Sequence, residues 1–146
     1  MRRPSKRKKF TSKKKKNPPS RLLSAAKFVR QGAYVCDVGT DHAYLPVYLV
    51  LTGRAARALA SDINKGPVMR AKKSVIKYGV SDKIDVALSN GLAGAESYPV
   101  TDIIIAGMGG ELIASIIDAA PWTKNTSIRL VLQPMTHSEI LRKTCT

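Results

Sequence analysis

Short apolar runs that are typical of buried strands recur along this chain, and stretches with apolar positions at helical spacing separate them. A run of aliphatic residues bounded by glycine, proline or acidic residues predicts a strand that is covered on both faces of a sheet. The five expected strands are Tyr34–Cys36, Arg57–Ser61, Ile84–Leu88, Asp102–Ala106 and Arg129–Leu132.

The intervening segments carry helical patterns. Leu22, Ala26 and Val29 follow each other at i, i+4 and i+7, which predicts a helix from a cap at Ser20 to a stop at Gly32. Further helices are expected from the end of the first strand to Gly53, from Pro67 to Gly79 and from Glu111 to Pro121. Strands that alternate with helices predict an α/β fold with a mostly parallel sheet and helices on both faces.

Charge divides the chain into an arm and a domain. Of its 25 Lys and Arg residues, ten lie in residues 1–16, which contain no acid, and the net charge is +15. Such a block repels itself, so we expect residues 1–19 to form a disordered arm whose usual partner is a phosphate polymer. A solvated tail without a dedicated partner is the alternative. Residues 20–146 form the predicted domain.

Compartment is indicated by what the sequence lacks. Cys36 and Cys145 form no CxxC motif, which favours a reducing environment, and no apolar run reaches the length of about 18 residues that a membrane helix needs. The basic start runs into Asn17–Pro19 rather than into the apolar region of a signal peptide. We therefore expect a cytoplasmic protein with no metal site, although an organellar transit peptide, which is also basic, stays open as an alternative.

The stretch Asp37–Pro46 is the centre of the predicted site. The first strand ends in the carboxylate of Asp37 and breaks at Gly39, as in the first strand–helix turn of a nucleotide-binding sheet. Only Gly39 occupies the glycine positions of the dinucleotide pattern GxGxxG, which argues against a nicotinamide oxidoreductase. The acid-x-Gly turn resembles instead the first motif of class I methyltransferases, and an ordinary tight turn capped by Asp41 is the alternative.

Six stretches in order extend this resemblance over residues 20–136: Ser20–Leu22, Asp37–Pro46, Ala60–Pro67, Asn90–Leu92, Ile105–Gly110 and Leu132–Met135. Together they resemble the bacterial tRNA (adenine(22)-N1)-methyltransferase family. The resemblance implies a Rossmann-like class I methyltransferase sheet, S-adenosylmethionine as cofactor and tRNA as substrate. Five of the seven strands expected of that class are present, so the chain looks truncated at its C-terminus, and the family's helical C-terminal domain is missing. The basic arm lies outside the resemblance.

Site residues follow from the same resemblance. Asp62 at the end of the second strand would accept the ribose hydroxyls, and Asn90 would bind the adenine edge of the cofactor. Turn formation is the alternative for Asp62 and for Asn90–Gly91, and close packing is the alternative for the glycine-rich Ala106–Gly110. The implied cofactor-binding residues are Arg21, Asp37, Gly39, Asp41, His42, Asp62, Ile63, Asn90, Gly91, Ala106, Gly107 and Met108.

The implied reaction needs little acid–base chemistry. Adenine N1 has an in-plane lone pair that can attack the methyl group directly, so catalysis reduces to alignment and electrostatics. N1 lies on the Watson–Crick edge, so the target adenine must be splayed out. The candidate catalytic residues are Asp41, which would stabilise the cationic methylated ring, and His42 and Tyr44, which would position or stack it. A purely structural role is the alternative for His42.

Two functions follow from the sequence. The first is a tRNA (adenine-N1)-methyltransferase, and the alternative is a truncated, non-catalytic protein with a methyltransferase fold that binds RNA. Because the turns that contact the cofactor follow the first four strands, we expect the chain to bind S-adenosylmethionine yet to methylate tRNA poorly alone. We also expect Leu130–Leu132 to form an unprotected apolar edge.

Overall fold

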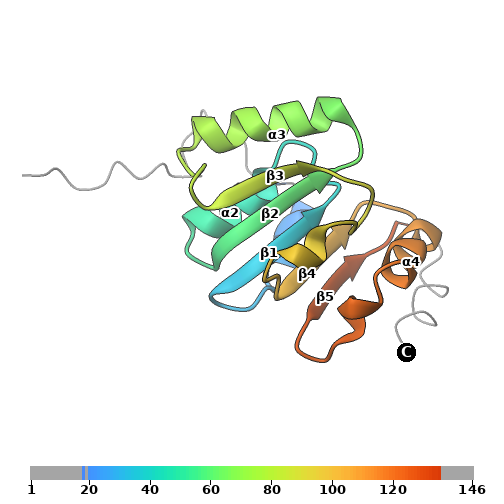
Figure 1. Cartoon of the computed structure of the whole chain (residues 1–146). Helices are drawn as coiled ribbons and strands as arrows, with labels where there is room; N and C mark the ends of the chain where they lie inside the picture. Colours follow the sequence, from blue (N-terminus) through green and yellow to red (C-terminus); the bar gives the residue numbers. More distant parts are fainter. Residues whose placement is uncertain (1–17, 19, 136–146) are drawn as a thin grey trace, which may run out of the picture.

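A computed structural model describes residue 18 and residues 20–135, which form one parallel sheet covered by helices (Figure 1). All four pairs of neighbouring strands are parallel, and the strand order is β3-β2-β1-β4-β5. The strands are β1 (Ala33–Val38), β2 (Ala55–Asp62), β3 (Ile84–Leu88), β4 (Asp102–Ala106) and β5 (Arg129–Gln133). Apart from residue 18, the predicted arm of residues 1–19 lies outside the described residues, and so does Cys145.

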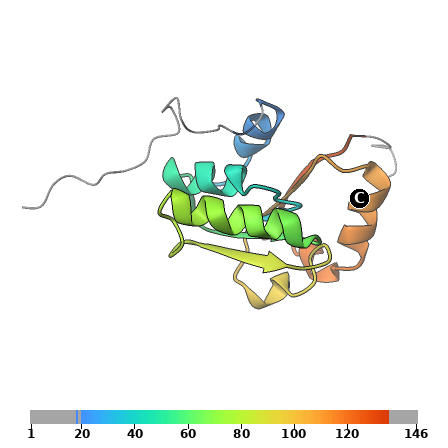
Figure 2. The same cartoon turned by 90° about the horizontal axis from the view of Figure 1, so that it is seen from above.

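Helices cover both faces of the sheet, as predicted (Figure 2). The helices α1, α2 and α3 pack on one face, and α4 and the short helix η1 pack on the other. Their bounds are α1 (Ser20–Ala26), α2 (Tyr44–Leu51), α3 (Lys65–Lys77), η1 (Ala95–Ser97), α4 (Gly110–Asp118) and η2 (Pro121–Lys124). The two 3₁₀ helices were not predicted, because a single tight turn leaves no periodic apolar pattern.

The core consists of two layers that the pleat of the strands separates. Along β1, Val35 packs with the helices α1–α3, whereas Cys36 and Val38 pack against α4. Ile103, Ile104 and Ile105 of β4 alternate in the same way and are fully buried. A central strand that is buried on both faces explains why its sequence is an unbroken apolar run.

The prediction for the first helix was wrong at both ends. Ser20 is the first residue of α1 rather than its cap, and α1 ends at Ala26 instead of at Gly32. The chain after Ala26 continues in tight turns, and the backbone N–H of Arg30 donates to the carboxylate of Asp102 at 3.0 Å. A side chain 72 residues away therefore takes the donor that a longer helix would have used.

The strand β5 lies at an edge of the sheet, as predicted, but its apolar side chains are at least partly buried. Within the described part of the chain, β5 pairs with β4 alone. Val131 is buried, and Leu130 and Leu132 are partly buried against the α4 side of the sheet. The open feature is therefore the hydrogen-bonding edge of the backbone and not an apolar surface. None of the helices in the described residues is long and apolar enough to span a bilayer.

The sheet order fixes where a ligand can bind. The chain leaves β1 toward β2 on one side, and β4 returns to the other side of β1. Loops that follow β1 and β4 therefore diverge at the carboxyl edge of the sheet, which is the position where open α/β sheets bind small ligands.

Candidate functional site

A cavity of about 440 Å³ lies at this edge, where the ends of β1 and β4 meet α1 and the start of α2. It includes most of the residues that the sequence predicts for the site, together with three apolar or hydroxyl side chains that the prediction missed. The lining residues are Arg21, Leu22, Asp37, Gly39, Thr40, Asp41, His42, Tyr44, Leu45, Ala106 and Gly107.

The loop after β1 has an unusual backbone. Gly39 has a φ of +75°, and the non-glycine residues Asp41 and Ala43 also have positive φ values, of +57° and +60°. The N–H groups of Gly39 and Thr40 both donate to the carbonyl of Ser61 in β2, each at 2.9 Å. The neighbouring strand therefore holds the loop in a conformation that residues other than glycine rarely adopt.

Asp37 is an acidic side chain that is almost completely buried. Its side chain is 7% exposed at the floor of the cavity. Burial raises the pKa of Asp37 to about 7, the nearby Asp62 carboxylate adds to the rise, and the Thr40 hydroxyl opposes it. A positively charged ligand in the cavity would favour the ionised form, so the site suits a cation.

Asp62 lies beside the cavity rather than in its wall. Its carboxylate accepts the N–H of Asn64 at 3.0 Å and the N–H of Asp41 at 3.4 Å. The first of these bonds is the turn role that the sequence left open as an alternative. The second bond connects the end of β2 to the loop after β1, so Asp62 braces the rim of the site.

Asp41 is already paired with a basic side chain. Its carboxylate lies 2.9 Å from Nη2 of Arg70 in α3 and 3.3 Å from Nδ1 of His42. The His42 ring stacks on Tyr44, with centroids 4.9 Å apart and an interplanar angle of 14°. Arg70 and Asp41 are 29 positions apart, so no local pattern in the sequence could have paired them.

The glycine-rich loop after β4 contributes backbone to the cavity. Ala106 and Gly107 line it, and the N–H of Gly107 donates to the carbonyl of Gln133 at 3.2 Å. Met108 does not line it. A Cβ built on Gly39 would approach Met108 Cε to 2.6 Å, so the Met108 side chain packs against the turn. The backbone carbonyl of Met108 accepts the N–H of Met135 at 2.8 Å.

Asn90 and Gly91 were predicted for this site, but the structure places them in the wall of a different cavity. That cavity, of about 370 Å³, lies between the loop after β3 and α4, where Leu112 and Ile116 also line it. Asn90 is exposed, and so is Ile63, which is 58% exposed and lines none of the cavities described for residues 18 and 20–135. The loop after β3 lies against α4, which covers the other face of the sheet from α1 and α2. In addition, β2 lies between β3 and β1, so this loop does not reach the first cavity.

Comparison with known proteins assigns this architecture to a family. The chain matches the family model described as a methyltransferase domain over residues 19–146. It is 41% identical over 123 residues to the tRNA (adenine(22)-N(1))-methyltransferase of Bacillus subtilis (strain 168), which covers 84% of this chain and 52% of that relative.

Solved structures agree with the match in sequence. The B. subtilis M1A22 tRNA methyltransferase TrmK superposes with a TM-score of 0.81 at 40% identity, over 85% of this chain and 53% of that one. A candidate tRNA (m1A22) methyltransferase of Streptococcus pneumoniae, in complex with S-adenosyl-L-methionine, gives a TM-score of 0.82 at 44% identity, over 86% of this chain and 59% of that one. The predicted methyltransferase fold is confirmed.

The extent of the match differs between this chain and its relatives. The chain spans about half the length of the curated relatives it matches. The matched half contains the five strands of the described residues and the cavity at the carboxyl edge of their sheet. The chain therefore belongs to the methyltransferase-domain family.

Proposed function

We propose that this chain binds S-adenosylmethionine in the cavity at the carboxyl edge of the sheet and transfers its methyl group to N1 of adenine 22 in tRNA. The observation that carries the proposal is the buried Asp37 carboxyl at the floor of a cavity that the Gly39 turn opens at the sheet's switch point. The names of the similar proteins supply the substrate, and the related S. pneumoniae structure contains the cofactor in complex.

The residues of the cavity fit this cofactor. When bound, S-adenosylmethionine supplies an electrophilic methyl group on a sulfonium cation. Asp37 offers a carboxylate to the positively charged methionine end, and Asp62 at the rim offers oxygens to ribose hydroxyls while it keeps its backbone bonds. Gly39 and Gly107 present backbone without side chains, so a ligand can approach closely.

The chain's own groups would act by alignment. The stacked rings of His42 and Tyr44 offer a flat surface on which a splayed adenine can lie. Asp41 shares its charge with Arg70, so its carboxylate counters a cationic ring less strongly than a free carboxylate would. Its larger contribution is to hold the His42 ring, whose Nδ1 lies 3.3 Å from it.

The proposed partner is tRNA, and the proposed location is the cytoplasm. The arm of residues 1–16 would add contacts with RNA phosphates because its charge is dense and of one sign. These three statements rest on sequence and on the names of relatives.

Cofactor binding tests the proposal at Asp62. We expect Asp62→Ala to weaken S-adenosylmethionine binding by about 1.5–3 kcal/mol in calorimetric titration, because hydrogen bonds to a charged acceptor are lost. Asp62→Asn is the control, since its amide oxygen can still accept the N–H of Asn64. Equal affinity in the wild type and in a folded Asp62→Ala variant would remove Asp62 from the site.

Methyl transfer separates the enzyme from a non-catalytic RNA-binding protein. Labelled cofactor is incubated with unmodified tRNA and with tRNA that carries guanine at position 22, with and without a fragment that supplies the other half of a relative. We expect label only in the adenine-containing tRNA, and weak transfer without the fragment. RNA binding with no label under either condition would favour the non-catalytic protein.

A further inference from the structure

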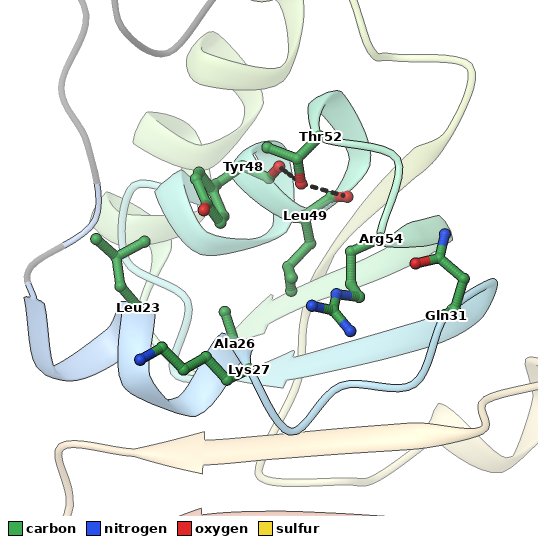
Figure 3. A pocket seen from close by; sticks show the side chains of 8 residues that line it. All are labelled: Leu23, Ala26, Lys27, Gln31, Tyr48, Leu49, Thr52 and Arg54. Carbon is green, nitrogen blue, oxygen red and sulfur yellow. Dashed lines mark hydrogen bonds between the residues drawn. The ribbon is translucent and has the colours of Figure 1, made fainter.

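A second large cavity, of about 460 Å³, lies between α1 and α2 on the face of the sheet that α1, α2 and α3 cover (Figure 3). It shares no lining residue with that site. Its lining residues are Leu23, Ala26, Lys27, Gln31, Tyr48, Leu49, Thr52 and Arg54. We call this cavity the helical groove.

The helical groove is positively charged and contains no acid. Lys27 follows α1, Arg54 precedes β2, and Figure 3 shows both side chains extending into the space beside α2. Neither cation pairs with a carboxylate anywhere in residues 18 and 20–135. By contrast, Arg30 and Arg57, which each follow one of these cations by three residues, have carboxylate partners. Arg30 pairs with Asp102 at 3.1 Å and Arg57 pairs with Asp85 at 3.9 Å.

Two neutral polar side chains of the groove, Gln31 and Thr52, are already bonded to nearby backbone. The Gln31 amide donates to the carbonyl of Gly53 at 2.6 Å, and the Thr52 hydroxyl donates to the carbonyl of Tyr48 at 2.8 Å. Arg54 donates one N–H, from Nη1, to the carbonyl of Val29 at 3.3 Å, which fixes the guanidinium and leaves its other donors for a ligand. The charged groups that remain available to a ligand in the groove are the cations of Lys27 and Arg54, so the groove suits an anion.

The groove and the methyl-transfer site are consecutive positions along the same two helices. Tyr44 of α2 lines the first cavity, and Tyr48 and Thr52 line the groove at i+4 and i+8, which is about 6 Å and 12 Å further along the helix axis. Arg21 of α1 lines the first cavity, and Lys27 lines the groove. A row of cations therefore leads away from the place where the target base would enter.

We propose that the helical groove binds two backbone phosphates of the RNA strand that carries the target adenine, one at Lys27 and one at Arg54. The inference rests on the proposed function for the identity of the ligand. A base that is drawn into the first cavity brings its strand with it, and the neighbouring phosphates must lie within a short distance of the cavity. The helices α1 and α2 run from the first cavity to the groove, so phosphates further along that strand can reach Lys27 and Arg54, which no carboxylate pairs with in residues 18 and 20–135.

The test compares two double variants of the full chain with the same loss of charge. Lys27→Gln/Arg54→Gln changes the groove, and Lys72→Gln/Lys73→Gln removes two exposed lysines from α3 that line no described cavity. Fluorescence anisotropy measures binding of a short single-stranded oligoribonucleotide over a range of salt concentrations. The slope of log K against log salt is negative, and we expect it to become less steep by roughly 1.4 in the groove variant, about 0.7 for each lost phosphate contact. It should change little in the α3 variant.

Two further measurements keep the result decisive. The side chain of Lys27 makes no hydrogen bond or ion pair with any residue in the described part of the chain, so Lys27→Gln should fold normally and reduce the steepness of the slope by roughly 0.7. Calorimetry with S-adenosylmethionine should give wild-type affinity in all of these variants. An unchanged slope in both groove variants, or an equal fall in the α3 variant, would overturn the inference. Absence of cofactor binding in the wild type would instead overturn the proposed function, and the salt slopes would still decide on the groove.

Discussion

At the scale of single residues, the site depends on the Asp37 carboxyl group, whose pKa is raised by its buried surroundings. Asp37 has an ordinary pKa of 3.8, and burial raises the pKa to about 7 in the folded chain. The folded state therefore binds this proton more tightly than the unfolded state between those two values. Its contribution to stability is complete below about pH 4 and is lost as the pH rises through about 7.

The first prediction uses this pH dependence. Without cofactor, the free energy of unfolding of the wild type should fall between about pH 5 and about pH 8, by on the order of a few kcal/mol relative to Asp37→Asn, which cannot ionise. Urea denaturation at both pH values measures the difference. Parallel pH profiles for the two proteins would mean that Asp37 is ionised in the folded chain throughout.

The second prediction concerns the turn at Gly39. Gly32 and Gly39 have nearly the same φ, +79° and +75°, but a Cβ at Gly32 would contact nothing within 4 Å, whereas a Cβ at Gly39 would meet Met108. Both Gly→Ala variants should lose about 1–2 kcal/mol of stability from the left-handed backbone. Only Gly39→Ala should also weaken S-adenosylmethionine binding in calorimetry, because the clash of its Cβ with Met108 would shift the turn that lines the cavity. Normal binding by that variant would contradict the placement of the cofactor at this turn.

At the scale of elements, one buried ion pair joins the end of the α1 segment to the sheet. Asp102 at the start of β4 is fully buried, and its carboxylate accepts the Arg30 N–H at 3.0 Å, Arg30 Nε at 3.2 Å and the Thr101 hydroxyl at 2.7 Å. The same contact ends α1 early and holds it over the cavity. The position of Arg21 in the site therefore depends on Asp102, which is not itself part of the site.

The third prediction follows from this contact. Asp102→Ala should lower the free energy of unfolding by about 2–3 kcal/mol, a moderate value because Arg30 is 39% exposed and water can solvate it. Asp85→Ala is the matched control, because its pair with Arg57 is about half exposed at 3.9 Å and should contribute less than about 1 kcal/mol. Chemical denaturation measures both, and equal losses would mean that burial does not strengthen the Asp102 contact.

At the scale of the whole molecule, charge is distributed unevenly, and the two parts would bind RNA differently. The groove offers two cations on the folded domain, whereas residues 1–16 offer ten without any acid. A dense basic segment gives affinity that depends on salt and not on sequence. The domain would therefore position the RNA, and the arm would raise its local concentration.

The fourth prediction tests the arm. If about five of its side chains contact phosphates, deletion of residues 1–16 should flatten the slope of log K against log salt by roughly 3 to 5. The measurement uses unmodified tRNA, and cofactor binding serves as the control because the residues that line the cavity, from Arg21 onward, are all kept. A slope that matches the full chain would show that the arm does not contact RNA.

The sequence by itself determined the order of strands and helices, the parallel sheet and the position of the Asp37–Gly39 turn, because each depends on local periodicity or on the conformational freedom of one glycine. Tertiary structure alone decided that Arg70 pairs with Asp41, that Asp102 ends α1 and that Asn90 lies beside α4 instead of in the cavity. The reason is physical. Hydrophobic spacing records which face of an element is buried, but an ion pair or a shared cavity depends on distances between elements, which are set only when the elements pack.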